Sequence, residues 1–461
     1  MTRRNELFVG VDVAEARFDV AFRDSVGQPV RSDRSFPNTP DGIRDLNGAI
    51  CACASLIGQK SRIIVGMEAT SNFHKGLEKT LREARPRTIE VHVINPYAIK
   101  QFKKMHLKVY KTDKLDAHMI ALYLAKIAPR PYPEPAPGQE ELKQLTRLRR
   151  SFSEETTKFK NRLRSLLRVH FPGYKQRLGN TISKKMLVAF SLYGSPHEIA
   201  AVDIDELADA RTAYRHKIGK VFADNLKLLV KDAPVQRLAP ALALVITWTA
   251  RRVLDLADQV KELDSQIAMM VEEYFPGNVL ESVPGLGGVS IAAIFGEIGD
   301  PKRFDTVEQF IGYIGLYPIV WESGQTKARF KMTKKGNKLL KMTFLVASAA
   351  GRRFNPVIHE LYYRLRKRGK SKKAAGGAIA RKLAAIVFTL LKNGEKWNPE
   401  KALAGMMKSE LMLTTGTDKK EKGNERPSEV VPQYVVNATI GAGSPCPLNQ
   451  NISENNGICK R

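Results

Sequence analysis

Four acidic residues near the start of the chain have the types and positions that a metal-dependent phosphodiester-cleaving site needs. Asp12 lies in the apolar segment FVGVDVA, where an unpaired carboxylate is costly, and Glu68 ends the apolar segment IIVGMEA. Asp113 and Asp116 are three residues apart at the start of a predicted helix capped by Thr112, which places both on one helix face. Oxygen ligands suit Mg²⁺, and a pair of such ions clamps the attacking and leaving oxygens in phosphodiester cleavage.

Each of these acids also has an ordinary structural interpretation. Asp12 could begin a turn, and Glu68 could be an exposed residue at a strand end. Asp113 and Asp116 could be first-turn acids that the helix dipole favours. Four acids from two strand ends and one helix start can nevertheless meet at one point. Their joint occurrence in this order favours a metal site over four unrelated acids.

The chain is strongly basic, which favours a polyanion as its partner. It has 461 residues, with 75 lysines and arginines against 47 aspartates and glutamates, a formal net charge of +28 and a pI near 9.9. Residues 327–373 contain 16 lysines and arginines and a single acid, Glu360. A surface whose charges served only solubility would mix the two signs, so this stretch indicates nucleic-acid binding.

Length and composition indicate a globular chain with room for about three domains. The four cysteines, Cys51, Cys53, Cys446 and Cys459, lack the spacing of a zinc finger or of a disulfide framework. The longest apolar run, 238–250, has 13 residues and contains a proline. The sequence also lacks the pattern of a signal peptide. We therefore expect no membrane partner and a cytoplasmic location.

The first part of the chain alternates strand and helix patterns, which indicates an α/β domain. Strand patterns occupy residues 7–22, where two short strands are joined by a turn, 62–70 and 89–96. Helical stretches lie between them, notably 72–84. A proline-rich connector, APRPYPEPAPG at 128–138, cannot continue a helix. We predict a metal-binding domain over residues 1–135.

Two long helices dominate the next region, which we predict to be a helical coiled-coil linker over residues 139–277. The first, from Gln139 to Phe171, is basic and carries on its apolar side Leu142, Leu145, Leu148, Leu163, Leu166 and Leu167. The second alternates three- and four-residue spacing through Val253, Leu256, Val260, Leu263, Ile267, Met270 and Tyr274. Such a heptad seam requires a partner helix. The spacing leaves open whether that partner is the first long helix or belongs to a second subunit.

We predict a mostly helical third domain over residues 278–400. It opens with a glycine-rich turn, PGLGG at 284–288, before an apolar helix. This form is typical of a helix-hairpin-helix motif, whose backbone N–H groups meet a DNA phosphate, although an ordinary tight turn has the same composition. The basic stretch follows, and then a last helix at 377–392. The final segment, 413–461, is polar and is predicted to be disordered.

Read together, a set of short motifs resembles a known family. The motifs are GVDVA with Asp12, MEAT with Glu68, VINP at 93–96, KTDKLDA with Asp113 and Asp116, PGLGG at 284–288, RFDTVEQFIGYIGLYP at 303–318, WESG with Ser323, and M-x-K-x-G-N-x-x-L at 332–340. They are similar to those of the DEDD transposases of bacterial insertion sequences, which are related to pilin-gene invertases and described as bridge-RNA-guided recombinases. One departure is Asn72-Phe73, where the family usually has Gly-Tyr.

The resemblance implies a RuvC-like, or RNase H-like, fold for the first domain. In it Asp12, Glu68, Asp113 and Asp116 would be catalytic and would bind two Mg²⁺ ions, with Mn²⁺ as an alternative ion. The resemblance also implies that Ser323 is the nucleophile and forms a 5′-phosphoserine link to DNA. Such a link can be resealed, whereas attack by water would hydrolyse the strand.

The same resemblance implies the partners of the protein. These are double-stranded DNA from the element ends and the target, a non-coding guide RNA, and further copies of the chain in a dimer or tetramer. In the family, the serine of one subunit meets the acids of another. A prokaryotic cytoplasm and association with the nucleoid follow from the same relationship.

We expect basic residues and the glycine-rich turn to hold nucleic-acid backbone. These residues are Lys104, Lys108, Lys111, Gly285, Gly287, Lys327, Arg329, Lys331, Lys334, Lys335, Lys338, Arg366, Arg368, Lys372 and Lys373. Contacts of this kind position a nucleic acid but do not read its sequence, so the choice of target must come from elsewhere, in the family from the guide RNA.

Two other functions fit part of the same pattern. One is a RuvC-like structure-specific endonuclease that uses water, since Ser-Gly is a common turn dipeptide and the sequence does not reveal a base beside Ser323. The other is a basic nucleic-acid-binding protein without activity, in which the acids are structural. A nucleophilic role of Ser323 would distinguish a recombinase from the water-dependent endonuclease. A catalytic role of the acids would distinguish a recombinase from the binding protein without activity.

Overall fold

The computed structural model describes most of the first 403 residues. The described ranges are 6–58, 61–69, 73–84, 89–106, 113–131, 134–211, 216–231, 238–323 and 326–403. The predicted disordered segment 413–461, the predicted helix cap Thr112, and the basic residues Lys108 and Lys111 lie outside these ranges. The division of the chain into domains at the predicted boundaries stays a prediction.

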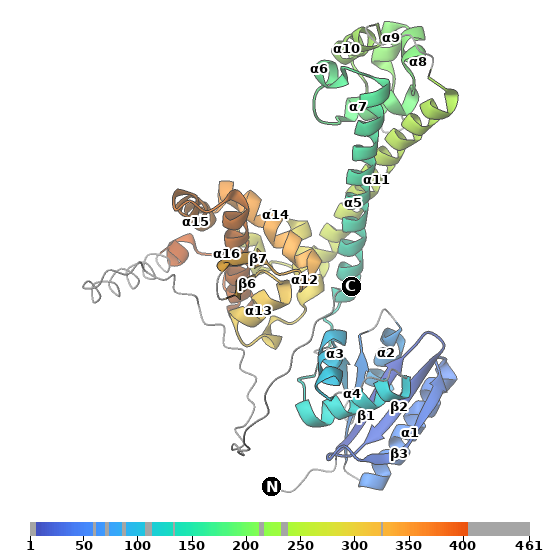
Figure 1. Ribbon diagram of the computed structural model, residues 1–461, viewed down its shortest axis with the longest axis vertical. Coiled ribbons are helices and arrows are strands. Elements are labelled where there is room, and N and C mark those ends of the chain that lie inside the picture. Colours follow the sequence, from blue (N-terminus) through green and yellow to red (C-terminus); the bar gives the residue numbers. More distant parts are fainter. Residues whose placement is uncertain are drawn as a thin grey trace, which may run out of the picture. The chain divides into compact units, whose positions relative to one another are not determined.

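A five-stranded mixed sheet forms the N-terminal part of the chain, in the order β3-β2-β1-β4-β5 (Figure 1). Its strands are β1 (Glu6–Val13), β2 (Arg17–Arg23), β3 (Pro29–Pro37), β4 (Arg62–Glu68) and β5 (Ile89–Ile94). Strand β1 pairs antiparallel with β2 and parallel with β4, which in turn pairs parallel with β5. The predicted α/β class of this part is confirmed.

Strand β3 has no counterpart among the predicted strands. It lies at the edge of the sheet, pairs antiparallel with β2, and buries Phe36 while most of its other side chains face solvent. A polar edge strand lacks the apolar alternation by which a strand is recognised in a sequence. Its role is to cover the outer side of β2.

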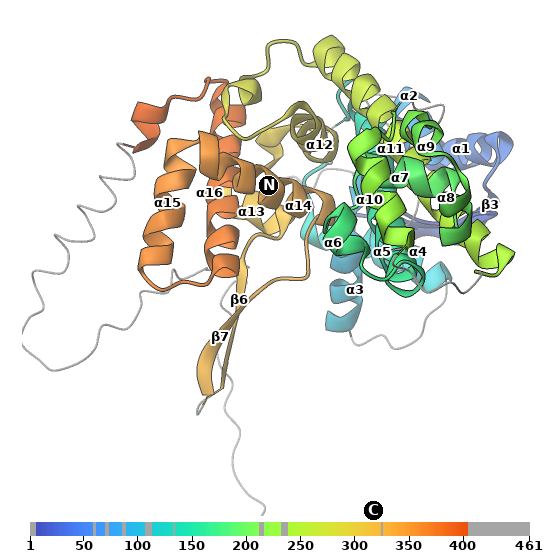
Figure 2. The same cartoon turned by 90° about the horizontal axis from the view of Figure 1, so that it is seen from above.

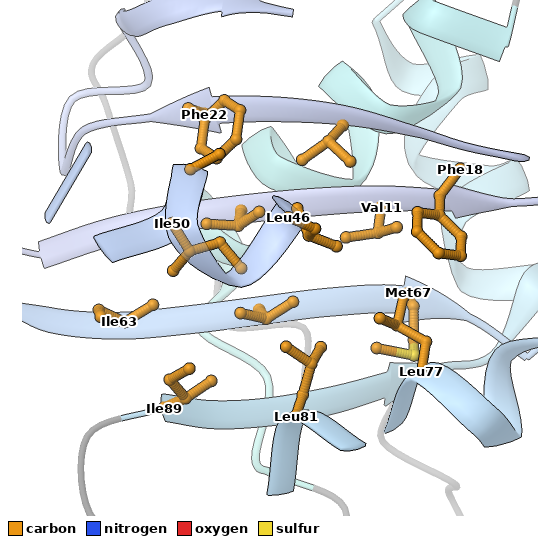
Figure 3. Packing of buried hydrophobic residues seen from close by; sticks show 14 of the residues in the cluster. Val11, Phe18, Phe22, Leu46, Ile50, Ile63, Met67, Leu77, Leu81 and Ile89 are labelled. Carbon is orange, nitrogen blue, oxygen red and sulfur yellow. The ribbon is translucent and has the colours of Figure 1, made fainter. Parts of the chain in front are cut away.

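Helices cover both faces of the sheet. On one face, α1 (Pro40–Ile57) and α2 (His74–Ala84) pack on residues such as Val11 and Met67 (Figure 3). On the other face, α3 (Pro96–Met105) and α4 (Asp113–Ile127) pack on Phe8, Ile64 and Ile94. Because side chains alternate along a strand, the even-numbered residues of β1 face α3 and α4.

A pair of glycines brings α4 close to the sheet. Gly10 of β1 and Gly66 of β4 are register partners. A Cβ atom on Gly10 would lie 2.1 Å from the carbonyl oxygen of Ala117, and one on Gly66 would lie 2.6 Å from Cδ1 of Leu124. Only hydrogen fits at Gly10, where the backbone of α4 lies directly against the strand, while at Gly66 the side chain of Leu124 packs against the glycine.

Two long helices follow, α5 (Gln139–His170) and α11 (Pro240–Tyr274), which run in opposite directions beside each other (Figure 1). Arg149 of α5 donates to Asp264, with Nη2 3.1 Å from Oδ2, and Arg252 of α11 lies 3.5 Å from Glu155. Val253, Leu256 and Ile267 of the α11 seam are buried, whereas Tyr274 is 39% exposed. The first long helix of the same chain packs along α11 and covers part of this seam.

The predicted apolar side of α5 is wrong at Leu148, whose side chain is 43% exposed. Thr146 is buried instead, and its hydroxyl donates a hydrogen bond of 2.7 Å to the carbonyl oxygen of Leu142. This internal bond satisfies the threonine hydroxyl within the helix, so the residue can enter the core without an unpaired polar group.

A small helical lobe connects the two long helices. It consists of α6 (Tyr174–Leu178), α7 (Lys184–Leu192), α8 (Pro196–Ala201), α9 (Ile204–Asp209) and α10 (Lys220–Lys231). Its core includes Phe171 and Phe190, whose ring centroids are 4.9 Å apart in an edge-to-face arrangement. The lobe therefore has its own apolar core.

The C-terminal part is mostly helical, as predicted. Its elements are η1 (Val279–Ser282), α12 (Gly288–Ile298), η2 (Pro301–Arg303), α13 (Val307–Ile314), β6 (Pro318–Ser323), β7 (Thr326–Met332), α14 (Lys338–Phe354), α15 (Pro356–Lys367) and α16 (Lys372–Asn393). Among the described helices, α16 alone is long and apolar enough to cross a membrane. It packs against α13, α14 and α15 and buries Leu383 and Val387, as a core helix does.

Replacing Gly10 by alanine tests the close contact of α4 with the sheet. Gly10→Ala is expected to lower the free energy of unfolding by about 2 kcal/mol, because the added methyl group must push α4 away from β1. Thermal or urea unfolding measures the loss.

The matched control is Gly48→Ala. Gly48 lies exposed inside α1 with no atom within 4 Å of its Cβ position. This change is expected to be neutral or to stabilise by up to about 1 kcal/mol, because alanine favours a helix over glycine. A Gly10→Ala variant as stable as the wild type would contradict the contact.

Candidate active site

Two of the four acids lie side by side at the ends of neighbouring parallel strands. Val11 pairs with Met67 in the β1–β4 ladder, so one further step along both strands brings Asp12 beside Glu68. Each acid lies two residues beyond a member of the glycine pair and therefore points to the same face, toward α4. Both side chains are half-buried.

Helix α4 supplies a third acid to this place. Asp116 directly precedes Ala117, whose carbonyl oxygen lies over Gly10, so the helix begins at the end of β1 that carries Asp12. Asp113 is the first residue of α4, but its side chain lies outside the described residues. The structure thus brings together Asp12, Glu68 and Asp116, and the participation of Asp113 stays a prediction.

The charges at this place repel one another. Burial raises the pKa of Glu68 above its ordinary value, and the nearby Asp116 carboxylate raises it further. The ammonium group of Lys103 acts in the opposite direction and lowers this pKa. Glu68 and Asp116, 48 positions apart in the chain, therefore lie near each other and near Lys103, whose Nζ is 2.7 Å from Oδ1 of Asp116.

The VINP motif places the lysine that reaches these acids. Asn95 caps α3, its side-chain oxygen accepting a hydrogen bond of 2.9 Å from the Tyr97 amide, and Pro96 occupies the first helical position. Lys103 lies on the last turn of the same helix, with Nζ 2.7 Å from Oδ1 of Asp116. The VINP motif, which resembles a strand end in the sequence, therefore sets the start of α3, the helix that carries Lys103.

A further carboxylate, that of Asp19 on β2, points to the same face of the sheet as Asp12. Asp19 was not identified from the sequence as a neighbour of these acids. It is the cross-strand partner of Asp12 and is only 3% exposed. Its carboxylate accepts a hydrogen bond from the Ser35 hydroxyl and lies 3.4 Å from Nε of Arg17. Side chains alternate along β2, so Asp19 points to the other face of the sheet from Phe18 and Val20. Only the pairing register shows that Asp19 lies beside Asp12.

The donor set at this place fits a divalent cation. It consists of carboxylate oxygens, which hard cations such as Mg²⁺ and Mn²⁺ prefer. The repulsion between Glu68 and Asp116, and the ammonium of Lys103 drawn to them, show that the site attracts positive charge. Within the described side chains, no group of three or more His, Cys, Asp or Glu already has the spacing of a bound metal.

Ser323 is the last residue of β6, at the tip of a two-stranded hairpin with β7. Ser323 pairs with Thr326 of β7 across the hairpin. The hairpin extends away from the helices of the C-terminal part (Figure 2). The side chain of Ser323 and those of Lys327, Arg329 and Lys331 on β7 lie outside the described residues.

A buried carboxylate anchors the chain that follows this hairpin. Glu297 of α12, 3% exposed, accepts two hydrogen bonds from Arg147 of α5, at 2.6 and 3.0 Å. It also accepts one of 2.6 Å from Asn337, which caps α14. Gly315 and Gly336 lie back to back, since a Cβ on Gly336 would lie 2.6 Å from Cα of Gly315. These contacts hold the chain segments on either side of the hairpin, near residues 315 and 337, against α12, which Arg147 joins to α5.

The remaining predicted nucleic-acid contacts are spread over several elements. Exposed among them are Lys104 on α3, Gly287, Lys334, Lys335, Lys338, Arg368, Lys372 and Lys373. Arg366 donates to the carbonyl oxygen of Lys370 and so closes the turn after α15. Gly285 has φ +99° and packs against the backbone of Gly351 in α14, which gives it a packing role of its own. The turn at 284–288 follows a 3₁₀ helix, η1.

Comparison with known proteins points to transposases. The family model of DEDD transposases of the IS110 type, described as "Transposase", matches residues 9–172, and a second model, described as "Transposase IS116/IS110/IS902 family", matches residues 277–363. An insertion element IS110 protein of 43.6 kDa from Streptomyces coelicolor is 24% identical over 84% of this chain and 94% of its own length.

Two further relatives span nearly their whole length. A mini-circle putative transposase for IS117 from Streptomyces coelicolor is 24% identical over 87% of this chain and 98% of its own length. A pilin gene-inverting protein from Moraxella bovis is 22% identical over 86% of this chain and 98% of its own length. Each of the three matches covers more than four fifths of this chain.

A glutamine at position 68 tests the electrostatic strain at the acids. Glu68→Gln is expected to raise the free energy of unfolding of the metal-free protein at pH 8 by about 1 kcal/mol. The fold raises the pKa of Glu68, so the folded protein binds this proton more tightly and loses stability as the pH rises through the raised pKa. A neutral side chain removes that loss.

The gain should shrink as the pH falls through the raised pKa of Glu68 and should vanish below the ordinary value of 4.5, where both states are protonated. Thermal unfolding with a chelator at pH 8 and pH 5 measures it. Glu15→Gln, in an exposed turn, is the control and should change stability by less than about 0.5 kcal/mol. A Glu68→Gln variant that is less stable than the wild type at pH 8 would refute the crowding of acids.

Proposed function

The chain belongs to the DEDD transposase family of insertion sequences, and from this premise we propose that it cuts and rejoins DNA through a covalent serine intermediate. Asp12, Glu68, Asp113 and Asp116 are the metal ligands, and Ser323 is the nucleophile. The observation that carries the proposal is the meeting of Asp12, Glu68 and Asp116 at one end of the sheet, next to a pair of glycines.

The acids would hold two Mg²⁺ ions, with Mn²⁺ as an alternative. When bound, such ions supply positive charge that stabilises the oxygens around phosphorus in the transition state. The protein's own part is positional. The β1–β4 register sets Asp12 beside Glu68, and the contact of α4 with Gly10 sets Asp116 against them. Buried Asp19 is the cross-strand partner of Asp12.

In the first step the hydroxyl oxygen of Ser323 attacks a backbone phosphorus of DNA. The bond from phosphorus to the 3′-oxygen breaks, and the proton that the serine loses balances the one that the 3′-hydroxyl gains. A phosphodiester between Ser323 and the 5′ end of the DNA results. Attack of a different 3′-hydroxyl on this link reverses the chemistry and releases the serine, so no external energy source is needed.

The position of Ser323 supports this role. A residue at the tip of a projecting hairpin can reach a DNA backbone that the body of the protein holds, and its own hairpin carries Lys327, Arg329 and Lys331. The Glu297 network holds the base of that hairpin against α5 and α12.

The named activity of a relative also favours rejoining over simple cutting. The Moraxella bovis relative is named a pilin gene-inverting protein. Inversion requires that each cut end is joined to a new partner, which hydrolysis by water does not provide. We therefore favour a serine recombinase over a RuvC-like endonuclease that uses water, and over a basic binding protein without activity.

The proposed partners are double-stranded DNA at the element ends and target, a non-coding guide RNA, and further copies of the chain as a dimer or tetramer. The exposed basic residues around 334–338 and 366–373 are suited to phosphate contacts, which hold a nucleic acid without reading its sequence. A cytoplasmic, nucleoid-associated protein in a prokaryotic cell is consistent with this activity.

Replacing the serine tests the covalent step. Ser323→Ala is expected to lower recombination by at least about a thousandfold, because removal of a nucleophile leaves only binding and positioning. It should also abolish the protein–DNA adduct that survives denaturation. Gel analysis of end-labelled DNA after denaturation, with and without protease, measures both. Ser265→Ala, an exposed serine on α11, is the control and should retain activity.

The alternatives give different outcomes in the same assay. Strand cleavage by the Ser323→Ala variant with free 5′ ends would favour the water-dependent endonuclease. Absence of cleavage by the wild-type protein, together with a loss of stability in Asp12→Asn, would favour the binding protein whose acids are structural. Loss of both adduct and cleavage in Asp12→Asn is expected under either enzyme model, so this variant does not separate those two.

Guidance by RNA has its own test. RNA that co-purifies with the full-length protein from its native host is expected to map beside the gene and to contain stretches complementary to the element ends and the insertion site. Sequencing of the bound RNA measures this. Unchanged recombination after complete removal of RNA would contradict guidance while leaving the serine chemistry intact.

A further inference from the structure

Lys103 is the cation that the fold itself places among the acids. Its Nζ lies 2.7 Å from Oδ1 of Asp116, and the two side chains are 25% and 16% exposed. Lys103 is therefore ion-paired with one of the three acids that the structure brings together.

The inward position of Lys103 is built into α3. The neighbouring Ile99 and Phe102 are buried and fix the rotation of the helix, while Lys100 and Lys104 are exposed. Asn95 and Pro96 fix where the helix begins. Three lysines within five positions thus divide into two that face solvent and one that faces the acids.

A half-buried cluster of carboxylates without a cation is costly. Two like charges about 4 Å apart repel each other by a few kcal/mol at the effective dielectric of a protein surface region. The strand register and the packing of α4 hold Glu68 and Asp116 near each other whether or not a metal is bound. A cation supplied by the chain relieves this repulsion in the metal-free state.

We propose that Lys103 is a built-in counter-cation that occupies the acid site until a divalent metal displaces it. The inference rests on the proposed function in one respect, that these acids bind the metal. Lys103 and the metal compete for Asp116. The lysine stabilises the metal-free fold, weakens the affinity for metal, and makes loading of the site dependent on the metal concentration.

Lys103→Met tests the proposal, because methionine retains much of the apolar stem and removes the charge. In the presence of a chelator the variant should unfold about 3 °C below the wild type. Its affinity for Mn²⁺, measured by isothermal titration without DNA, should be about tenfold tighter, since nothing has to be displaced. Lys104→Met, the exposed neighbour, should change neither value.

Two further variants exclude a purely structural effect. Lys103→Arg retains the charge and should restore the melting temperature of the metal-free protein. In an Asp116→Asn background, Lys103→Met should cause a much smaller loss of stability, because the partner charge is gone.

The outcomes separate this inference from the proposed function. Mn²⁺ binding that is unchanged or weaker in Lys103→Met would overturn the competition while leaving the metal site in place. Absence of Mn²⁺ binding in the wild type, in Lys103→Met and in Lys104→Met alike would overturn the metal site itself and the competition with it. Equal melting temperatures of the metal-free wild type and Lys103→Met would overturn the role as counter-cation.

Discussion

The contact of α4 with a pair of glycines is the constraint on which the N-terminal site depends. Gly10 and Gly66 face each other across β1 and β4, and a side chain at Gly10 would overlap the backbone of α4. Since side chains alternate along a strand, the residues two positions later point the same way, and these are Asp12 and Glu68. Both strands thus share the pattern glycine-x-acid. The glycine allows α4 to pack closely on the sheet, and the acid two residues later points toward the first turn of α4.

This arrangement has an electrostatic cost that the function requires. Burial and Asp116 both raise the pKa of Glu68, so the folded chain holds like charges where water cannot fully screen them. Such a site binds cations well because its carboxylates repel one another when no cation is present. Lys103 and the metal are two solutions to the same repulsion, one present in the chain and one taken up from solution. Function and stability therefore make opposite demands on these residues.

Much of the site could be predicted because its residues lie at the ends of recognisable elements. Asp12 and Glu68 end apolar strands, and Asp116 begins a helix, so the carboxyl ends of parallel strands and the start of α4 could be expected to meet. Lys103 and Asp19 could not be identified as members of the site from the sequence. The rotation of α3 decides which of its lysines faces the acids, and the register of β2 decides that Asp19 lies beside Asp12. Pairing of this kind is a property of the folded chain.

The misses in the fold have similar causes. Strand β3 is polar because it lies at an edge of the sheet. Thr146 is buried in place of Leu148, and its hydroxyl is satisfied within α5. The packing of Gly285 against α14 is visible only in three dimensions, and its contact with a phosphate stays a prediction. The partner of the α11 seam was open for the same reason, since a heptad pattern requires a partner but does not identify it.

Diffraction from crystals grown with Mn²⁺ tests the central claim most directly, because anomalous scattering locates the metal without reference to activity. The account predicts a strong anomalous peak within about 2.3 Å of carboxylate oxygens from Asp12, Glu68 and Asp116, with Nζ of Lys103 moved away from Asp116. An absent peak at saturating Mn²⁺, or a peak held by only one of these three acids, would contradict it.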